Sequence, residues 1–420
     1  MPPDRPSLLA PLRHRPFLFL ALGRFVTMFG NAIAPIALAF AVLDLTGSVS
    51  DLGLVVAARS LTNVVFLLFG GVVADRLPRQ FVMVAASILA AVSQGLVAAL
   101  VLTSSATVAL LAGLGVVNGF ASAFSFPASS ALLAQTVPEG SRQQANALNR
   151  LGINTGMIAG ASAGGALIAV VGPGWGLALD AATFVVAAVA FALIRVPSVR
   201  AAASSSNTLA DLRDGWREFT ARAWVWVIVL AFCFVNAAVV GGKAVLGPAV
   251  ADDTIGRQAW GLVLATQTVG MVIGGIVAMR LRIRRFLLFG TLFVAADVPF
   301  LVFLGVAPTV PVLLVCALLS GFGFEQFGVA WETALQDHIP PDRLARVYSY
   351  DALGSFVAIP LGEVAAGPVA HAVGVGPALV GAAGIVLVAT IAAILNRSVR
   401  TLRHNPRRPA EEAAPATTAA

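Results

Sequence analysis

Charged side chains interrupt several long apolar stretches of this sequence. These stretches contain three carboxyl groups, of Asp297, Glu325 and Glu363, and two guanidinium groups, of Arg24 and Arg59. A carboxyl group among apolar residues can exchange a proton with trapped water, pair with a base or hydrogen-bond a neighbouring helix. A buried arginine can pair with such an acid, contact a substrate or extend toward water along its apolar stem. These residue types predict proton exchange, ion pairing or substrate contact.

Asp297 is the acid that lies deepest in its apolar stretch. It follows Phe286 by 11 residues, or ~16 Å along a helix, which is close to the middle of a bilayer. A lone ionised carboxylate there would cost several kcal/mol, so we expect it to be protonated, paired or hydrated. Asn31 and Asn236 can hydrogen-bond a ligand without a charge penalty, or can bond other helices instead. For Asp180 we favour a hydrogen bond to a neighbouring helix or loop.

The elements that position these residues are apolar windows of membrane-spanning length. Backbone amides in lipid must be satisfied within the segment, and the alternation of a barrel strand is absent, so we expect helices. Twelve windows are separated by turn or charge signals, near residues 17–43, 52–74, 81–103, 106–132, 151–171, 174–195, 224–247, 259–280, 286–305, 311–331, 349–369 and 375–396.

The composition excludes several classes of protein. Of the 420 residues 58% are hydrophobic and 11% are charged, which a soluble core of this length could not accommodate. Two cysteines in apolar stretches provide neither a disulfide framework nor a metal-ligand spacing, so we expect no metal. The four histidines form no catalytic group, and no nucleotide-binding motif is present, so we expect no enzyme and no cofactor.

Basic residues predict the orientation. With both termini in the cytoplasm, cytoplasmic segments hold 23 of the 27 basic residues. The net charge of +7 suits contact with anionic lipid headgroups and does not require nucleic acid. We therefore predict a bacterial inner-membrane protein with a cytoplasmic N-terminus (1–16), a six-helix bundle (17–195), a cytoplasmic linker with an amphipathic helix (196–223), a second six-helix bundle (224–396) and a disordered cytoplasmic tail (397–420).

An internal repeat relates the two bundles. Residues 70–76 (GGVVADR) and 274–280 (GGIVAMR) share five of seven positions at an offset of 204, and four further positions match at an offset of 202. Parallel repeats of this kind place the working cavity between the halves. Glycines also recur at every fourth position of the window 151–171, which leaves one face of that helix flat so that a neighbouring helix can pack closely. These are Gly152, Gly156, Gly160 and Gly164.

The sequence resembles the major facilitator superfamily. Gly71, Asp75, Arg76, Arg79 and Gln80 follow that superfamily's loop pattern G-x-x-x-D-R-x-x-R-K between helices 2 and 3. The resemblance implies a gating loop of Gly71, Asp75, Arg76 and Arg79, in which Asp75 caps a helix of the other half. The alternative is a loop that only fixes the topology through its positive charges.

Two further segments resemble the macrolide and enterobactin efflux branch of that superfamily. They are residues 331–351 (WETALQDHIPPDRLARVYSYD) and 177–184 (LALDAATF). This resemblance implies a monomeric exporter of a small amphipathic molecule (a drug, antibiotic or siderophore-like metabolite) that works by alternating access, with protons as a second partner. Helix 4 lacks the arginine of many proton-coupled antiporters, so a facilitator or importer without proton coupling stays open.

Overall fold

The computed structural model describes residues 10–138, 141–196, 216–217, 219–281 and 283–403. Within these ranges the chain is nearly all helical, and twelve helical segments are long and apolar enough to cross a membrane. The twelve predicted spans are confirmed. Their helices are α1 (Arg15–Thr46), α2 (Val49–Arg76), α3 (Arg79–Leu102), α4 (Val108–Thr136), α5 (Arg142–Val171), α6 (Pro173–Ala192), α8 (Ala223–Val240), α9 (Gly247–Asp253), α10 (Arg257–Ala278), α11 (Phe286–Phe293), α12 (Asp297–Val306), α13 (Val310–His338), α14 (Pro341–Phe356), α15 (Ile359–Val373) and α16 (Val375–Leu395).

Three of the spans are interrupted, which the apolar windows did not predict. A π-helical segment, Gly241–Leu246, separates α8 from α9 in the seventh span. A 3-10 segment, Val294–Ala296, separates α11 from α12 in the ninth, and α14 ends just before α15 begins with Ile359 and Pro360. Glycine pairs and prolines permit such breaks because they weaken the regular hydrogen-bond ladder, and π segments often occur at functional sites.

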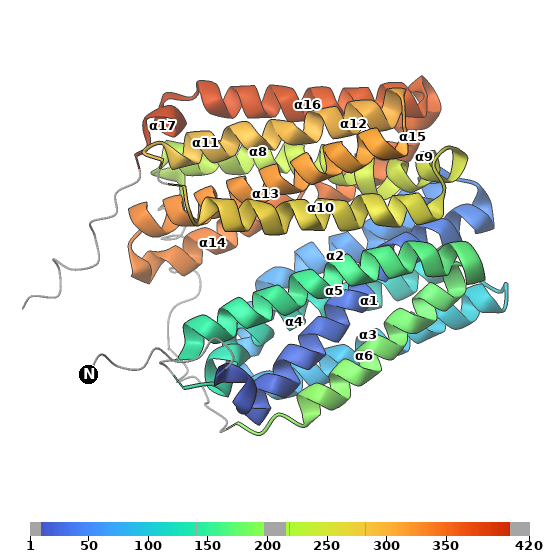
Figure 1. The fold of residues 1–420 in the computed structure, drawn as a ribbon, viewed down its shortest axis with the longest axis horizontal. Helices are drawn as coiled ribbons and strands as arrows, with labels where there is room; N and C mark the ends of the chain where they lie inside the picture. Colours follow the sequence, from blue (N-terminus) through green and yellow to red (C-terminus); the bar gives the residue numbers. More distant parts are fainter. Residues whose placement is uncertain (1–9, 139–140, 197–215, 218, 282, 404–420) are drawn as a thin grey trace, which may run out of the picture.

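The helices pack as two bundles with the same internal pattern. In the first bundle α2 packs on α4 and α3 packs on α6; in the second, α10 packs on α13 and α12 on α16. These are equivalent positions of the sequence repeat. Figure 1 shows the bundles lying one above the other, the first in blue and green and the second in yellow to red. The fold is the predicted all-α arrangement of two parallel six-helix repeats.

The bundles touch mainly through α5 against α10 and α2 against α15. In Figure 1 their ribbons converge on the right and diverge on the left, where the N-terminus lies. We call these ends the contact end and the terminal end. Near the contact end, a Cβ built on Gly261 of α10 would lie 2.7 Å from the Cα of Gly165 in α5. Only glycines allow the two backbones to approach so closely.

The segments outside the bundles are described in part. Of the predicted amphipathic linker, residues 197–215 and 218 lie outside the described residues. Phe219 is buried; its ring stacks on Trp216 and lies near the ring of Tyr350 in α14. The predicted disordered tail differs at its start, because α17 (Arg397–Thr401) is helical and buries Val399. A chain end is ordered when one of its apolar side chains is buried against the rest of the protein. Residues 404–420 lie outside the described residues.

We predict that Gly261→Ala destabilises the contact end. The added methyl would overlap backbone atoms, and such overpacking typically costs about 1–3 kcal/mol. The melting temperature of the purified protein in detergent should therefore fall by several degrees. Gly113→Ala in α4 is the matched control, because a Cβ there meets nothing within 4 Å. Equal melting temperatures for the two variants would contradict the close contact.

Candidate functional site

A cavity of about 240 Å³ lies inside the first bundle, among α1, α2, α3, α4 and α6. Three residues singled out from the sequence line it: Arg24 and Asn31 from α1, and Arg59 from α2. Arg24 and Asn31 are seven residues apart, or two helical turns, and therefore share one face of α1. The cavity thus brings together two basic side chains and an amide in a largely apolar bundle.

Arg59 connects this cavity to acids from both bundles. Its guanidinium interacts electrostatically with the carboxylates of Asp180 in α6 and Glu363 in α15. Ser60, the next residue, donates a hydrogen bond to Glu363 Oε2. Glu363 and Asp180 are both buried, so this cluster is a polar connection between the bundles in otherwise apolar surroundings. Of the roles that the sequence allowed for Arg59, these electrostatic interactions favour one near buried acids.

Asp180 also lies against α1, but the predicted hydrogen bond between its carboxyl group and a neighbouring helix or loop is not found among the described residues. A Cβ built on Gly30 of α1 would lie 2.4 Å from Asp180 Oδ1 and 2.1 Å from Thr183 Oγ1. Glycine at this position therefore lets α6 pack its polar groups directly on α1. Within the described residues Asp180 Oδ1 and Asn31 Oδ1 are buried without a hydrogen-bond partner.

A second polar cluster lies within the other bundle. Lys243 forms an ion pair with Asp297 Oδ1 and donates a second hydrogen bond, of 2.9 Å, to Ser320 Oγ. Ser320 in turn donates to Asp297 Oδ1 over 2.5 Å, and Gln267 Nε2 donates to Ser320 Oγ over 3.0 Å. The ammonium also lies 4.7 Å from the centre of the Phe300 ring. Asp297 is therefore paired, one of the three states that the sequence allowed.

The ion pair is built from the interrupted spans. Lys243 lies in the π-helical segment Gly241–Leu246, and Asp297 directly follows the 3-10 segment Val294–Ala296. Lys243 is not among the candidate residues that were singled out from the sequence. The sequence did carry a signal for this ion pair. The second half has one lysine and one aspartate that are each isolated in an apolar window, and opposite charges in a low-dielectric interior need each other.

Two further ion pairs join the bundles. Near the contact end Arg257 of α10 binds both carboxylate oxygens of Asp44 in α1, at 2.5 and 2.9 Å, and also binds Asp252 of its own bundle at 2.8 Å. Toward the terminal end Arg150 of α5 donates to Glu325 of α13 over 2.9 Å. Glu325 is thus paired through an arginine that is itself largely exposed.

The remaining predicted site residues take other places. Asn236 of α8 donates to the Ser355 carbonyl over 2.9 Å, so it connects helices of the second bundle and does not line the cavity. Gly156, Gly160 and Gly164 pack on α1, whereas a Cβ on Gly152 meets nothing within 4 Å. The glycine face is therefore shorter than the sequence suggested.

The predicted gating loop is described only in part. Gly71, Asp75 and Arg76 form the end of α2, but their side chains lie outside the described residues. Arg79 begins α3 and has interactions with neighbouring groups. The capping contact expected of Asp75 therefore stays a prediction.

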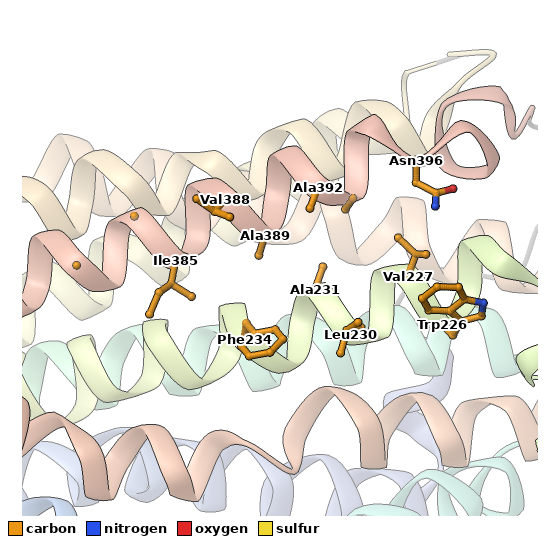
Figure 2. Close-up of a pocket in the computed structure, with 13 residues that line it drawn as sticks. Trp226, Val227, Leu230, Ala231, Phe234, Ile385, Val388, Ala389, Ala392 and Asn396 are labelled. Carbon is orange, nitrogen blue, oxygen red and sulfur yellow. The ribbon is translucent and has the colours of Figure 1, made fainter.

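An apolar groove of about 710 Å³ runs between α8 and α16. Figure 2 shows Leu230, Phe234 and Ile385 among the side chains that line it, with Trp226 and Asn396 together at one end. Its lining is nearly all aliphatic and aromatic. The groove therefore has few groups that could recognise a polar ligand, and we do not assign the functional site to it.

Comparison with known proteins places the chain in a family. Residues 6–417, nearly its whole length, match the family described as transmembrane secretion effector. The chain belongs to this family of the major facilitator superfamily. This transporter is 27% identical over 388 residues to the multidrug efflux pump Tap of Mycolicibacterium fortuitum, covering 86% of its own chain and 90% of that protein. It is 24% identical over 279 residues to the uncharacterized MFS-type transporter YvqJ of Bacillus subtilis (strain 168), covering 64% and 65%.

Solved structures share the fold of the transporter. The nucleoside transporter NupG superposes with a TM-score of 0.75 at 14% identity, covering 90% of this chain and 98% of that one. A bacterial homologue of the iron transporter ferroportin in an inward-facing state gives 0.72 at 18% identity, with coverage of 90% and 98%. At these identities the likeness establishes the fold alone.

We predict that the Lys243–Asp297 pair stabilises the second bundle only as a pair. Lys243→Met or Asp297→Leu alone leaves one charge buried, which typically costs about 3–5 kcal/mol, whereas removing both charges costs far less. In a thermal unfolding assay each single variant should melt well below the double variant. A double variant that melts as low as the sum of the singles would contradict the pairing.

Proposed function

We propose that this transporter exports a small amphipathic molecule across the bacterial cytoplasmic membrane by alternating access. The sequence similarity to a protein named as a multidrug efflux pump, over most of both chains, supports the outward direction. The cavity inside the first bundle, which holds Arg24, Asn31 and Arg59 and does not lie between the halves as the repeat suggested, supports a binding site for a small molecule.

The observation that carries this proposal is the placement of the interbundle ion pairs. Asp44–Arg257 joins the bundles at the contact end and Arg150–Glu325 joins them toward the other end. Both pairs are present in this structure. Rocking that separates the bundles at the contact end would lengthen the Asp44–Arg257 contact, so this pair favours the present state over the alternative one.

The distribution of basic residues supports the orientation. If the terminal end faces the cytoplasm, as the positive-inside rule predicts, then the contact end is the outer end and the structure corresponds to an inward-facing state. A molecule from the cytoplasm or inner leaflet would then reach the first bundle's cavity before the bundles rock.

For proton coupling we favour Glu363 over Asp297. Glu363 accepts a hydrogen bond from Ser60 of the other bundle and lies near Arg59, so protonation would weaken an attraction that holds α15 to α2. Asp297, in contrast, contacts Lys243 and Ser320 of its own bundle. The described α4 carries no basic residue, which keeps a proton-independent facilitator or importer as the second candidate.

We predict that Glu363→Gln uncouples transport from the proton gradient. Inside-out membrane vesicles containing the wild type should accumulate radiolabelled tetracycline or 3-(4-hydroxyphenyl)propionate when energised, and a protonophore should abolish this accumulation. The variant should lose accumulation but keep counterflow exchange, because binding and rocking remain. Glu332→Gln, an exposed acid on α13, is the matched control. Equilibration without accumulation above the external concentration, unaffected by the protonophore, would favour the facilitator. Entry only into right-side-out vesicles would favour the importer.

We also predict that Asp44→Asn opens the contact end. The substitution removes the interbundle partner of Arg257, so the state in which the outer ends separate becomes more populated. Cysteines that carry spin labels are introduced at the exposed positions 105 and 307, in loops of the two bundles at that end. Pulsed electron paramagnetic resonance should then show an additional population with a longer distance between the two labels.

The control for this measurement is Asp252→Asn, which removes an acid that Arg257 contacts within its own bundle. The two native cysteines, Cys233 and Cys316, are replaced by alanine so that labels report only the chosen sites. Identical distance distributions for the Asp44 and Asp252 variants would contradict a gating role of the interbundle pair.

A further inference from the structure

The two basic residues in the first bundle's cavity differ in their partners. Arg59 interacts electrostatically with the carboxylates of Asp180 and Glu363. Arg24 has no ion pair among the residues that the structure describes. A guanidinium stays protonated, and a partly buried one without a counterion is unfavourable. The Arg24 guanidinium in the cavity therefore has no acidic partner among the described residues.

Asn31 supplies a second unmet group in the same cavity. Its Oδ1 atom is buried and has no hydrogen-bond partner within the described residues. An amide oxygen accepts hydrogen bonds, so a hydroxyl or N–H group of a ligand would satisfy it. It lies about 10 Å from Arg24 along α1, since each of the seven intervening steps rises by 1.5 Å.

Apolar side chains, together with several serine and threonine side chains, line the cavity around these two groups. Met28 lies between them on α1, and Met83, Phe184 and Phe191 line the cavity from α3 and α6. Methionine and phenylalanine side chains pack well against the flat or aliphatic part of a ligand. The volume of about 240 Å³ suits a small molecule or the polar head of a larger one.

From this arrangement we propose that the cavity binds an amphipathic organic acid. The acid group, a carboxylate in the simplest case, pairs with Arg24, and a hydroxyl or N–H group at the other end of the ligand donates to Asn31 Oδ1. The apolar body lies against Met28 and Phe184. This assignment rests on the proposed export function, since it names the class of molecule that would be exported.

The test measures binding, which does not depend on transport. The probes are 3-(4-hydroxyphenyl)propionate and tyramine, which share a phenol on a two-carbon chain and differ in carrying a carboxylate or an ammonium. Calorimetric titration uses the purified transporter in nanodiscs of zwitterionic lipid, so that no anionic lipid competes for Arg24. We expect the acid to bind at least about tenfold more tightly than the amine, since a buried charge pair contributes that much or more.

The variants locate the site. Arg24→Gln should lower the affinity for the acid at least about tenfold, and Arg24→Lys should keep part of the wild-type affinity. Asn31→Leu should lower the affinity less than Arg24→Gln does. Arg195→Gln, an exposed arginine at the end of the first bundle, should bind like the wild type. The melting temperature of each variant shows that it is folded, and the partial rescue by lysine separates charge pairing from packing.

Several outcomes would overturn the assignment. Tighter binding of tyramine, no binding of the acid, or an unchanged affinity of Arg24→Gln would each show that Arg24 does not select an acid. These results leave the export proposal standing if vesicles still accumulate tetracycline. Conversely, binding that depends on Arg24 without any accumulation in vesicles would uphold the ligand class and contradict export.

Discussion

Lipid provides no hydrogen bonds and little screening, so a charged side chain within a membrane helix must find its partner on another helix. Within the second bundle Lys243, Asp297, Ser320 and Gln267 satisfy one another. In the first bundle Arg59 interacts electrostatically with Asp180 of its own bundle and with Glu363 across the interface, whereas Arg24 has no acid among the described residues. The two repeats thus share one helix arrangement but differ in which charges they leave for another molecule or for the other bundle.

Close backbone contact is the second constraint on the fold. Without a hydrophobic driving force between helices in lipid, packing depends on small residues that let backbones approach. The Gly165–Gly261 contact between the bundles and the Gly30–Asp180 contact within the first bundle both depend on a missing side chain. One holds the contact end together, and the other brings a buried acid next to the cavity.

The interbundle contacts are of two kinds, and they suit a molecule that has two states. Glycine contacts are short-ranged and weaken as soon as the helices begin to separate, whereas ion pairs at a partly exposed surface are weak and exchangeable. Asp44–Arg257 and Arg150–Glu325 both include exposed groups. Contacts of this strength stabilise one conformation by only a small free energy, so the other conformation stays accessible, as alternating access requires.

The sequence by itself determined the number of spans, the repeat and the superfamily, because apolar length, charge in loops and short motifs are local properties that lipid makes decisive. It also identified Arg24, Asn31 and Arg59 as unusual, since a polar group in an apolar window is visible without a structure. Only the tertiary structure decided which residues meet: that Asp297 pairs with Lys243, that Asn236 bonds a helix of its own bundle, and that Arg24 and Arg59 share a cavity. Such meetings depend on the rotation and depth of helices far apart in the chain and on local π and 3-10 segments, and hydrophobic periodicity does not encode these with sufficient accuracy.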